Sequence, residues 1–247
     1  MFKKTFNNFP LNFIGIINTM VLNDRIVIVK KAETIASDIF NIGAKNMDTA
    51  LLLIRSLYKY GEDLVETIER KKKIPGKIEC KVGCSYCCYA QVSLTPPEAV
   101  FIGHFIKENY SLRQTDALMK RSTGNIRLTK GKSLEERIDI WEKTPCIFLE
   151  NDKCSIYEVR PFICRAWHSL SVDQCERAFH SGNKDAEIDS TPYRNIIFGA
   201  VRDGLSNACD LYGCESIPIE IASSIKIILQ HPSPEEAWIK GEKLFNQ

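Results

Sequence analysis

The chain has 247 residues, of which 44% are hydrophobic and 26% charged, and these ordinary globular values argue against a largely disordered chain. Its 33 basic and 31 acidic side chains leave a formal charge of +2, so there is no bulk electrostatic reason to expect nucleic acid or a membrane surface as a partner. The 10 cysteines stay well below the ~8–10% that marks a small disulfide-stapled protein.

The N-terminal region resembles a signal peptide only faintly. Lys3 and Lys4 precede an apolar stretch, Leu11–Leu22, but polar residues interrupt it and no small-residue cleavage site follows before Asp24. No run approaches the ~18 uninterrupted apolar residues that are needed to span a bilayer. We therefore expect a cytoplasmic protein, whose reducing surroundings favour metal-ligating or redox cysteines over structural disulfides.

Residues 25–73 are predicted to be helical. The segment Asp48–Lys73 carries apolar residues at the spacing of an amphipathic helix. It ends in a basic run, residues 70–73, which is followed by Pro75-Gly76. Basic side chains suit the C-terminal end of a helix, so we interpret this run as a solvated helix end rather than a binding patch.

Serine and threonine caps predict three helices in the central region. These are a helix that follows Thr95 and runs through Ile106, a helix from Ser111 to about Gly124, and Leu134–Glu142 after the cap Ser133.

Two short apolar strips around a polar turn then predict a small β-hairpin. The strips are Cys146–Leu149 and Cys154–Tyr157, and Glu150–Lys153 is the predicted four-residue turn. Arg160-Pro161 should end the hairpin and lead into a short helix that carries Cys164.

The C-terminal region is predicted to be helical again. Pro192–Leu211 reads as a helix with one apolar face, and Ile217–Leu229 as a short apolar helix or strand-like run. A capping box from Ser233 to Glu236 should open the last helix.

The predicted fold class is therefore mainly α with a small β-hairpin, an irregular α+β arrangement of helices surrounding a cysteine-rich metal-binding centre. Three segments are expected: an N-terminal helical extension (residues 1–77), a cysteine-cluster metal-binding domain (78–182) and a C-terminal helical region that packs on it (183–247).

The cysteines are concentrated in the central segment: none occurs in residues 1–79. The candidate metal ligands are Cys80, Cys84, Cys87, Cys88, Cys146, Cys154, Cys164 and Cys175. Short spacings let thiolates converge on one ion, and soft thiolates select zinc, iron–sulfur clusters or copper(I). Gly83 would allow the positive φ that such a tight loop needs.

Eight thiols exceed what one zinc ion or one [4Fe–4S] cluster requires. Two mononuclear sites, one polynuclear site, and one site with spare thiols all remain open. Adjacent Cys87 and Cys88 normally point apart, so both need not bind the same ion.

The motifs Cys-x3-Cys-x2-Cys-Cys (80–88), Pro-Cys-Ile-Phe-Leu (145–149) and Cys-Ser-Ile-Tyr-Glu-Val-Arg-Pro-x2-Cys-Arg (154–165) resemble the YkgJ-type cysteine-cluster family. The resemblance covers roughly residues 80–175 and implies chelation of zinc or iron. Some members of that family are linked to lysine methylation of flagellin. This chain departs from the family pattern at Ile147, where a second proline is common, but the departure removes no ligand.

Two arginines in the last motif could act on the metal site from outside. Four thiolates around a dication leave a net negative charge, which Arg160 and Arg165 could offset by donating hydrogen bonds to sulfur. The alternative is a surface salt bridge with one of the nearby carboxylates Glu150, Asp152 or Glu158. Tyr157 and Trp167 are expected to pack around the site.

Three weaker candidates lie outside these motifs. His168 could supply an imidazole ligand, although a hydrogen-bonded structural histidine is the better interpretation. Cys209 and Cys214 could join the cluster or belong to the core.

The leading functional hypothesis is a metal-chelating protein that binds zinc or an iron–sulfur cluster and has no turnover of its own, with a protein partner or protein substrate left open beside the metal ion. The first alternative is an enzyme that uses S-adenosylmethionine on a protein substrate or in radical chemistry. The Cys80-x3-Cys84-x2-Cys87 spacing fits a radical S-adenosylmethionine enzyme, but such an enzyme needs a barrel of alternating strands and helices. The second alternative is a zinc-ordered module that docks a protein partner.

Overall fold

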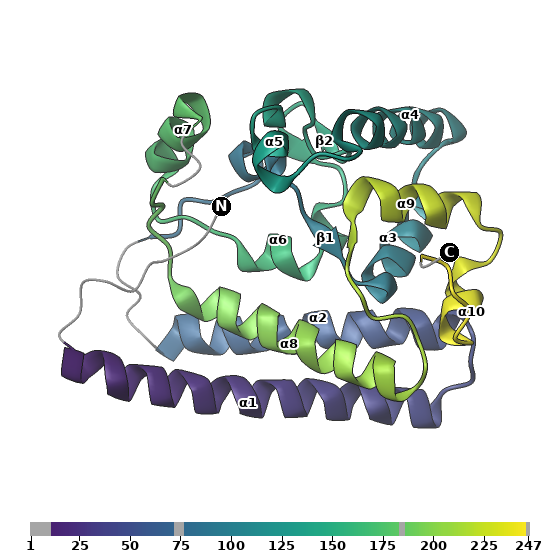
Figure 1. The fold of residues 1–247 in the computed structure, drawn as a ribbon. Coiled ribbons are helices and arrows are strands. Elements are labelled where there is room, and N and C mark those ends of the chain that lie inside the picture. Colours follow the sequence, from purple (N-terminus) through teal and green to yellow (C-terminus); the bar gives the residue numbers. More distant parts are fainter. Residues whose placement is uncertain (1–10, 72–76, 183–185, 246–247) are drawn as a thin grey trace.

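The fold was analysed in a computed structural model, which describes residues 11–71, 77–182 and 186–245 (Figure 1). The α-helices of this part are α1 Leu11–Ile42, α2 Met47–Lys71, α3 Pro96–Asn109, α4 Leu112–Thr129, α5 Leu134–Ile138, α6 Phe162–Ala166, α7 Val172–Ser181, α8 Pro192–Leu211, α9 Ile221–Gln230 and α10 Pro234–Ile239. The short 3-10 helices are η1 Tyr86–Tyr89, η2 Trp141–Lys143 and η3 Tyr157–Val159. The mainly α fold class with a small β component is confirmed.

Two antiparallel two-stranded sheets complete the described part. Strands β2 (Leu149–Glu150) and β3 (Lys153–Cys154) form the hairpin, with Leu149 opposite Cys154. Strands β1 (Ser93–Leu94) and β4 (Ile219–Glu220) pair across more than a hundred residues of chain. The sequence did not predict this second sheet, because a two-residue strand has no periodicity to recognise.

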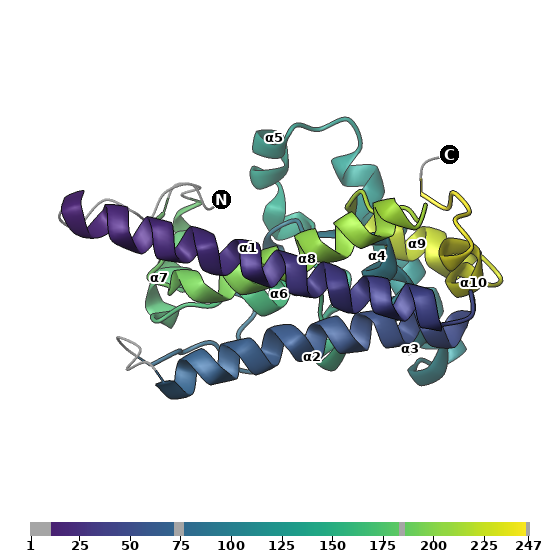
Figure 2. The same cartoon turned by 90° about the horizontal axis from the view of Figure 1, so that it is seen from below.

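Three long helices, α1, α2 and α8, lie side by side and form one layer of the molecule (Figures 1 and 2). The helix α8 closely approaches α1 at Gly204, where a Cβ atom added to the glycine would lie 2.4 Å from the Val29 carbonyl oxygen and 2.7 Å from the Cβ of Ala32. Small residues on both helices therefore allow the two backbones to approach each other.

The remaining helices pack above this layer. At one end α3, α9 and α10 contact each other or α2, and at the other end α7, η1 and the β2–β3 hairpin surround the cysteines (Figure 1). One hydrophobic core joins these parts: Leu53 of α2, Ile102 of α3, Phe148 before the hairpin and Trp238 of α10 are all completely or almost completely buried. The division into segments 1–77, 78–182 and 183–247 stays a prediction.

The predicted helix starts in the central region are confirmed. Thr95 and Glu98 form a capping box at α3, where the Glu98 Oε2 accepts a hydrogen bond from the Thr95 backbone N–H at 2.9 Å. Ser111 and Ser133 cap α4 and α5 in the same way.

Two of the predicted helix ends are wrong. The helix α4 continues past Gly124 to Thr129, because Ile126 packs against the core and a single glycine costs only about 1 kcal/mol in a helix. The helix α5 ends at Ile138, and the 3-10 helix η2 follows where more α-helix was expected.

The hairpin turn is tighter than predicted. Glu150 pairs with Lys153 as part of the ladder, so the turn consists of two residues, Asn151 and Asp152. Their φ angles of 49° and 59° are those of a type I′ turn, which matches the twist of the flanking strands. Asn and Asp tolerate this left-handed region better than most residues.

In the C-terminal region, Pro192–Leu211 is confirmed as a helix, and the apolar run from Ile217 divides into β4 and α9. The predicted capping box at Ser233 is wrong in its contacts. Helix α10 does begin there, but Ser233 makes no side-chain cap, and the Glu236 Oε2 instead accepts a hydrogen bond from the Lys240 Nζ at 3.0 Å.

Helices cover most of the N-terminal part. The predicted helix Asp48–Lys73 is confirmed as α2, which ends at Lys71, while residues 72–76 lie outside the described part. The stretch that resembles a signal peptide is the first part of α1. Within the described ranges, no helix is both long enough and apolar enough to cross a membrane.

Candidate metal centre

The cysteine loop is built from a turn and a short 3-10 helix. The Cys84 backbone N–H donates to the Lys81 carbonyl at 3.0 Å, and Gly83 has a φ of 95°, as a type II turn requires at its third residue. The positive φ predicted at Gly83 is therefore confirmed. The helix η1 follows and carries Cys87 and Cys88.

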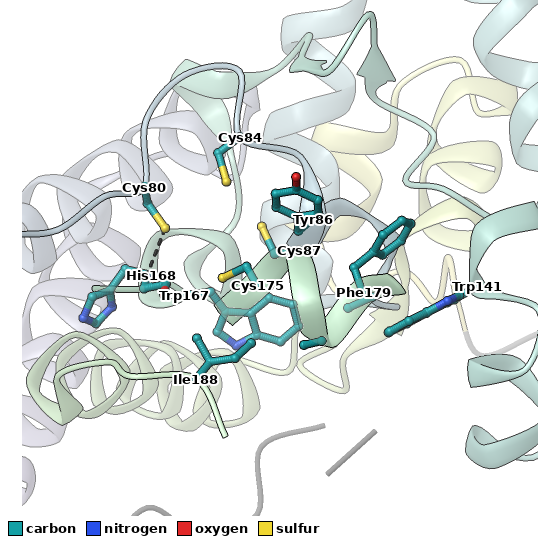
Figure 3. Close-up of a pocket in the computed structure, with 13 residues that line it drawn as sticks. Cys80, Cys84, Tyr86, Cys87, Trp141, Trp167, His168, Cys175, Phe179 and Ile188 are labelled. Atoms are coloured by element: carbon teal, nitrogen blue, oxygen red, sulfur yellow. Dashed lines mark hydrogen bonds between the residues drawn. The ribbon is translucent and has the colours of Figure 1, made fainter. Parts of the chain in front are cut away.

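Four thiols line one pocket of about 60 Å³, and Figure 3 shows their sulfurs turned toward a common space. Cys80, Cys84 and Cys87 come from the loop, whereas Cys175 comes from α7. The sequence did not predict α7, although Ser171, whose side chain accepts a hydrogen bond from the Gln174 backbone N–H, is a recognisable helix cap. The fold thus places the thiol of Cys175, which is distant in sequence, beside the three thiols of the loop.

Aromatic rings form the other wall of this pocket. Phe179 of α7 contacts Tyr86, Tyr89 and Trp141, with ring centroids 5.8, 4.7 and 5.4 Å apart, respectively. Trp167 also lines the pocket, as expected, whereas Tyr157 is 38% exposed and does not line it (Figure 3). The pocket is larger than the ~10–15 Å³ that one water-sized sphere occupies, so its size does not limit it to a single small ion.

The other four predicted ligands lie beside the hairpin. The Cys146 backbone N–H donates to the Cys88 carbonyl at 2.7 Å, which joins the end of η1 to the segment before β2. Cys154 lies in β3 and Cys164 in α6. Among the described residues, no group of three or more His, Cys, Asp or Glu side chains is already arranged around one ion position.

A buried carboxylate holds Cys164 in place. Glu98 is 1% exposed, and its Oε1 accepts a hydrogen bond from the Phe162 backbone N–H at 2.6 Å, at the start of α6. Its other oxygen caps α3 through Thr95, so one side chain links the two helix starts. Burial raises the pKa of Glu98, while the backbone hydrogen bonds from Phe162 and Thr95 act in the opposite direction.

Burial, and after it the charge of neighbouring thiols, raises the pKa of Cys84 and Cys146. Burial, followed by the negative charge of Cys80 and Cys87, raises the pKa of Cys84 to about 11. Burial, with the charge of Cys154 as a further contribution, raises the pKa of Cys146 to about 12. A bound cation reverses this repulsion and displaces the protons, so we expect metal affinity to increase with pH.

Arg160 fits the predicted role beside the sulfurs. Its guanidinium lies 4.1 Å from the centre of the Tyr157 ring, and its buried Nε has no hydrogen-bond partner among the described residues. The Arg160 charge lowers the pKa of both Cys87 and Cys154, against the larger contributions that raise them. A buried N–H donor without a partner beside thiols suits an anionic thiolate centre, so the residues present fit a bound metal.

Arg165 was predicted to donate to sulfur or to pair with Glu150, Asp152 or Glu158, and both expectations are wrong. Its guanidinium forms an ion pair with Glu62 of α2 and lies 4.1 Å from the centre of the Tyr58 ring. It also donates to the carbonyl oxygens of Arg160 at 2.7 Å and Glu158 at 2.6 Å. Arg165 therefore connects the segment of residues 158–165 to α2.

Ser169 is a site residue that sequence reasoning missed. Its backbone N–H donates to the Cys80 Sγ at 3.0 Å, the contact drawn as a dashed line in Figure 3. Its side chain lowers the pKa of Cys175 through a hydrogen bond, against the larger effect of burial. Backbone donors to sulfur leave no signal in the sequence, because any residue other than proline could provide one.

His168 lies at the pocket as a structural histidine, as expected. Its Nδ1 is 3.1 Å from the Ala166 carbonyl oxygen, and its Nε2 accepts from the Thr191 backbone N–H at 3.0 Å. Only the neutral ring protonated on Nδ1 satisfies both contacts. Burial lowers the pKa of His168 below its ordinary value.

We expect a His168→Gln variant to be less sensitive to acid than the wild type. Because the pKa of His168 is lower in the folded state, the unfolded chain binds more protons as the pH falls below about 6.5, and wild-type stability decreases there. Thermal unfolding of both proteins as purified, with their metal, at pH 7.5 and pH 5.5 measures this. An equal decrease in Tm for both proteins would contradict the assignment.

Cys209 and Cys214 belong to the core and do not line the pocket. They are 0% and 4% exposed, at the end of α8. The Cys214 backbone N–H donates to the Cys209 carbonyl at 2.9 Å, and Gly213 between them has a φ of 73°, which together define a Schellman motif. Contact between these two positions is a usual part of that motif, so the core interpretation accounts for both thiols.

Fold and site together define a class: a mainly helical protein that gathers cysteine thiols around a pocket. The model of the CxxCxxCC family, described as "Putative zinc- or iron-chelating domain", matches residues 79–188, so this part of the chain is similar to that family. The resemblance to a cysteine-cluster family is thereby confirmed, and a metal ion is the partner that the domain implies. No curated protein and no solved structure matches the chain.

Proposed function

We propose that this protein binds zinc or iron, as ions or as an iron–sulfur cluster, through the thiolates of its central segment. The observation that supports this most is the pocket, where Cys80, Cys84 and Cys87 meet Cys175 from a separate helix. Four thiolates satisfy a tetrahedral zinc ion or the four irons of a cubane cluster. When bound, zinc orders the fold around it, whereas a cluster also carries electrons.

The fold gives no support to the radical S-adenosylmethionine alternative. That chemistry needs a barrel of alternating strands and helices, but the β-structure of the described residues consists of two two-stranded sheets. A protein-methylating enzyme and a zinc-ordered docking module stay as predictions. A docking module would contain zinc without an iron chromophore, whereas binding of S-adenosylmethionine would favour the enzyme.

The test is anaerobic purification followed by elemental analysis and visible spectroscopy. We expect zinc or iron in a fixed ratio to protein, with a brown colour and sulfide if a cluster is present. Cys84→Ser should lose at least half of this metal, because a serine hydroxyl is a poor ligand for a soft metal. Cys214→Ser is the matched control, since that thiol is buried away from the pocket.

Two results would overturn the proposal. One is wild-type protein that contains no zinc and no iron under these conditions. The other is a Cys84→Ser variant whose metal content equals that of the wild type and of Cys214→Ser.

A further inference from the structure

We infer that the eight central thiols form two separate four-thiolate metal centres, which meet at the adjacent pair Cys87 and Cys88. This inference rests on the proposed function and specifies its sites. The pocket centre consists of Cys80, Cys84, Cys87 and Cys175. The hairpin centre consists of Cys88, Cys146, Cys154 and Cys164.

The pocket separates the first group from the second. Its lining includes four thiols, and none of the hairpin group is among the residues that form its wall. Figure 3 shows the sulfurs of Cys80, Cys84, Cys87 and Cys175 turned toward a common space. The Ser169 backbone N–H, which donates to the Cys80 Sγ, belongs to this group alone.

The second group is anchored in the core instead. Cys146, Cys154 and Cys164 are partly buried and pack against the hydrophobic core, whereas the pocket thiols do not. The three are electrostatic neighbours of each other and of Cys87: burial, followed by the charges of Cys146, Cys87 and Cys154, raises the pKa of Cys164. Cys87 therefore lies close to this group as well as in the pocket, where the two groups meet. The first group therefore lines a pocket, and the second group lies at the edge of the hydrophobic core. Such different surroundings favour two separate metal centres over one.

The short helix η1 supplies one thiol to each group. Cys87 lines the pocket, while the carbonyl of Cys88 is bound by the backbone N–H of Cys146, which holds Cys88 next to the hairpin group. Cys87 joins the other three thiols of the pocket group, and Cys88 joins the other three thiols of the hairpin group. Each centre then has four ligands, the number that a closed tetrahedral site uses.

Arg160 lies where the two groups meet. It is an electrostatic neighbour of Cys87 in the pocket group and of Cys154 in the hairpin group, and its buried Nε has no partner among the described residues. Two four-thiolate centres side by side would each carry net negative charge. A buried guanidinium between them reduces their mutual repulsion.

The experiment counts metal per chain in single and double variants. The wild type is expected to hold two centres, and Cys175→Ser or Cys154→Ser to hold one. The double variant Cys175→Ser/Cys154→Ser should hold none, whereas Cys84→Ser/Cys175→Ser, which alters one group twice, should still hold one. Cys214→Ser should match the wild type.

Titration of metal-free wild-type protein with Co²⁺ provides a second measurement that needs no variant to fold. Thiolate-to-cobalt absorption should increase until two equivalents are bound. A plateau at one equivalent, or loss of all metal from both Cys175→Ser and Cys154→Ser, would overturn the two-centre inference and leave the proposed function intact. Absence of metal and of cobalt binding in the wild type would overturn both.

Discussion

Gly204→Ala is expected to destabilise the protein by up to about 2 kcal/mol, although alanine is the better helix former. The added Cβ would lie 2.4 Å from the Val29 carbonyl oxygen and 2.9 Å from the Glu33 backbone nitrogen. Backbone atoms within α1 cannot rotate away from a new methyl group, so the two helices must separate. Overpacking costs about 1–3 kcal/mol, and contact with rigid backbone atoms belongs at the upper end of that range. The helix-propensity gain of ~1 kcal/mol offsets only part of this cost.

The matched control lies in the same helix. Gly199 of α8 has no atom within 4 Å of a Cβ position, so Gly199→Ala should be neutral or stabilise the protein by up to about 1 kcal/mol. Urea unfolding followed by circular dichroism measures both variants. If the two substitutions changed the free energy of unfolding equally, the close approach of α1 and α8 would be wrong.

Local signals predicted much of the fold, since capping residues and periodicity are properties of neighbouring residues. Pro192–Leu211 is a helix with the predicted bounds, and the caps Thr95, Ser111 and Ser133 begin helices as expected. Pairing across long stretches of chain leaves no such signal. The β1–β4 sheet and the contact of α8 with α1 at Gly204 depend on residues far apart in sequence.

In the candidate site, too, features that depend on local sequence could be predicted, and contacts between distant residues could not. Cysteine spacing predicted that thiols would cluster, and the pocket brings Cys175 to the loop. It could not predict that Arg165 pairs with Glu62 on another helix, because the motif alone contains no information about α2. Nor could it predict the backbone hydrogen bond from Ser169 to Cys80.

Removing the metal is expected to loosen the cysteine segment and leave the three-helix layer folded. The proposed ligands lie in the loop, η1, the hairpin, α6 and α7, and none lies in α1, α2 or α8. Apart from the metal, the contacts that join this segment to the rest include the hydrogen bond from the Glu79 backbone N–H to the Ser169 carbonyl at 3.1 Å and the packing of Phe179 against Tyr86 and Tyr89. Metal binding to thiolates contributes folding free energy directly, so this segment depends on it most.

Hydrogen exchange with and without a chelator measures this difference along the chain. In the metal-free protein, backbone amides of residues 79–90 and of α7 should exchange at least about tenfold faster, because these segments open more often. Amides in the core of α1, α2 and α8 should keep their protection, since the contact at Gly204 does not involve the metal. Restoring the metal should restore slow exchange, and the chelator should have less effect on Cys84→Ser, which has already lost a ligand of the pocket. Unchanged exchange in residues 79–90 after complete metal removal would show that this segment folds without the metal. The expectation that the metal stabilises the fold of the cysteine segment would then be wrong.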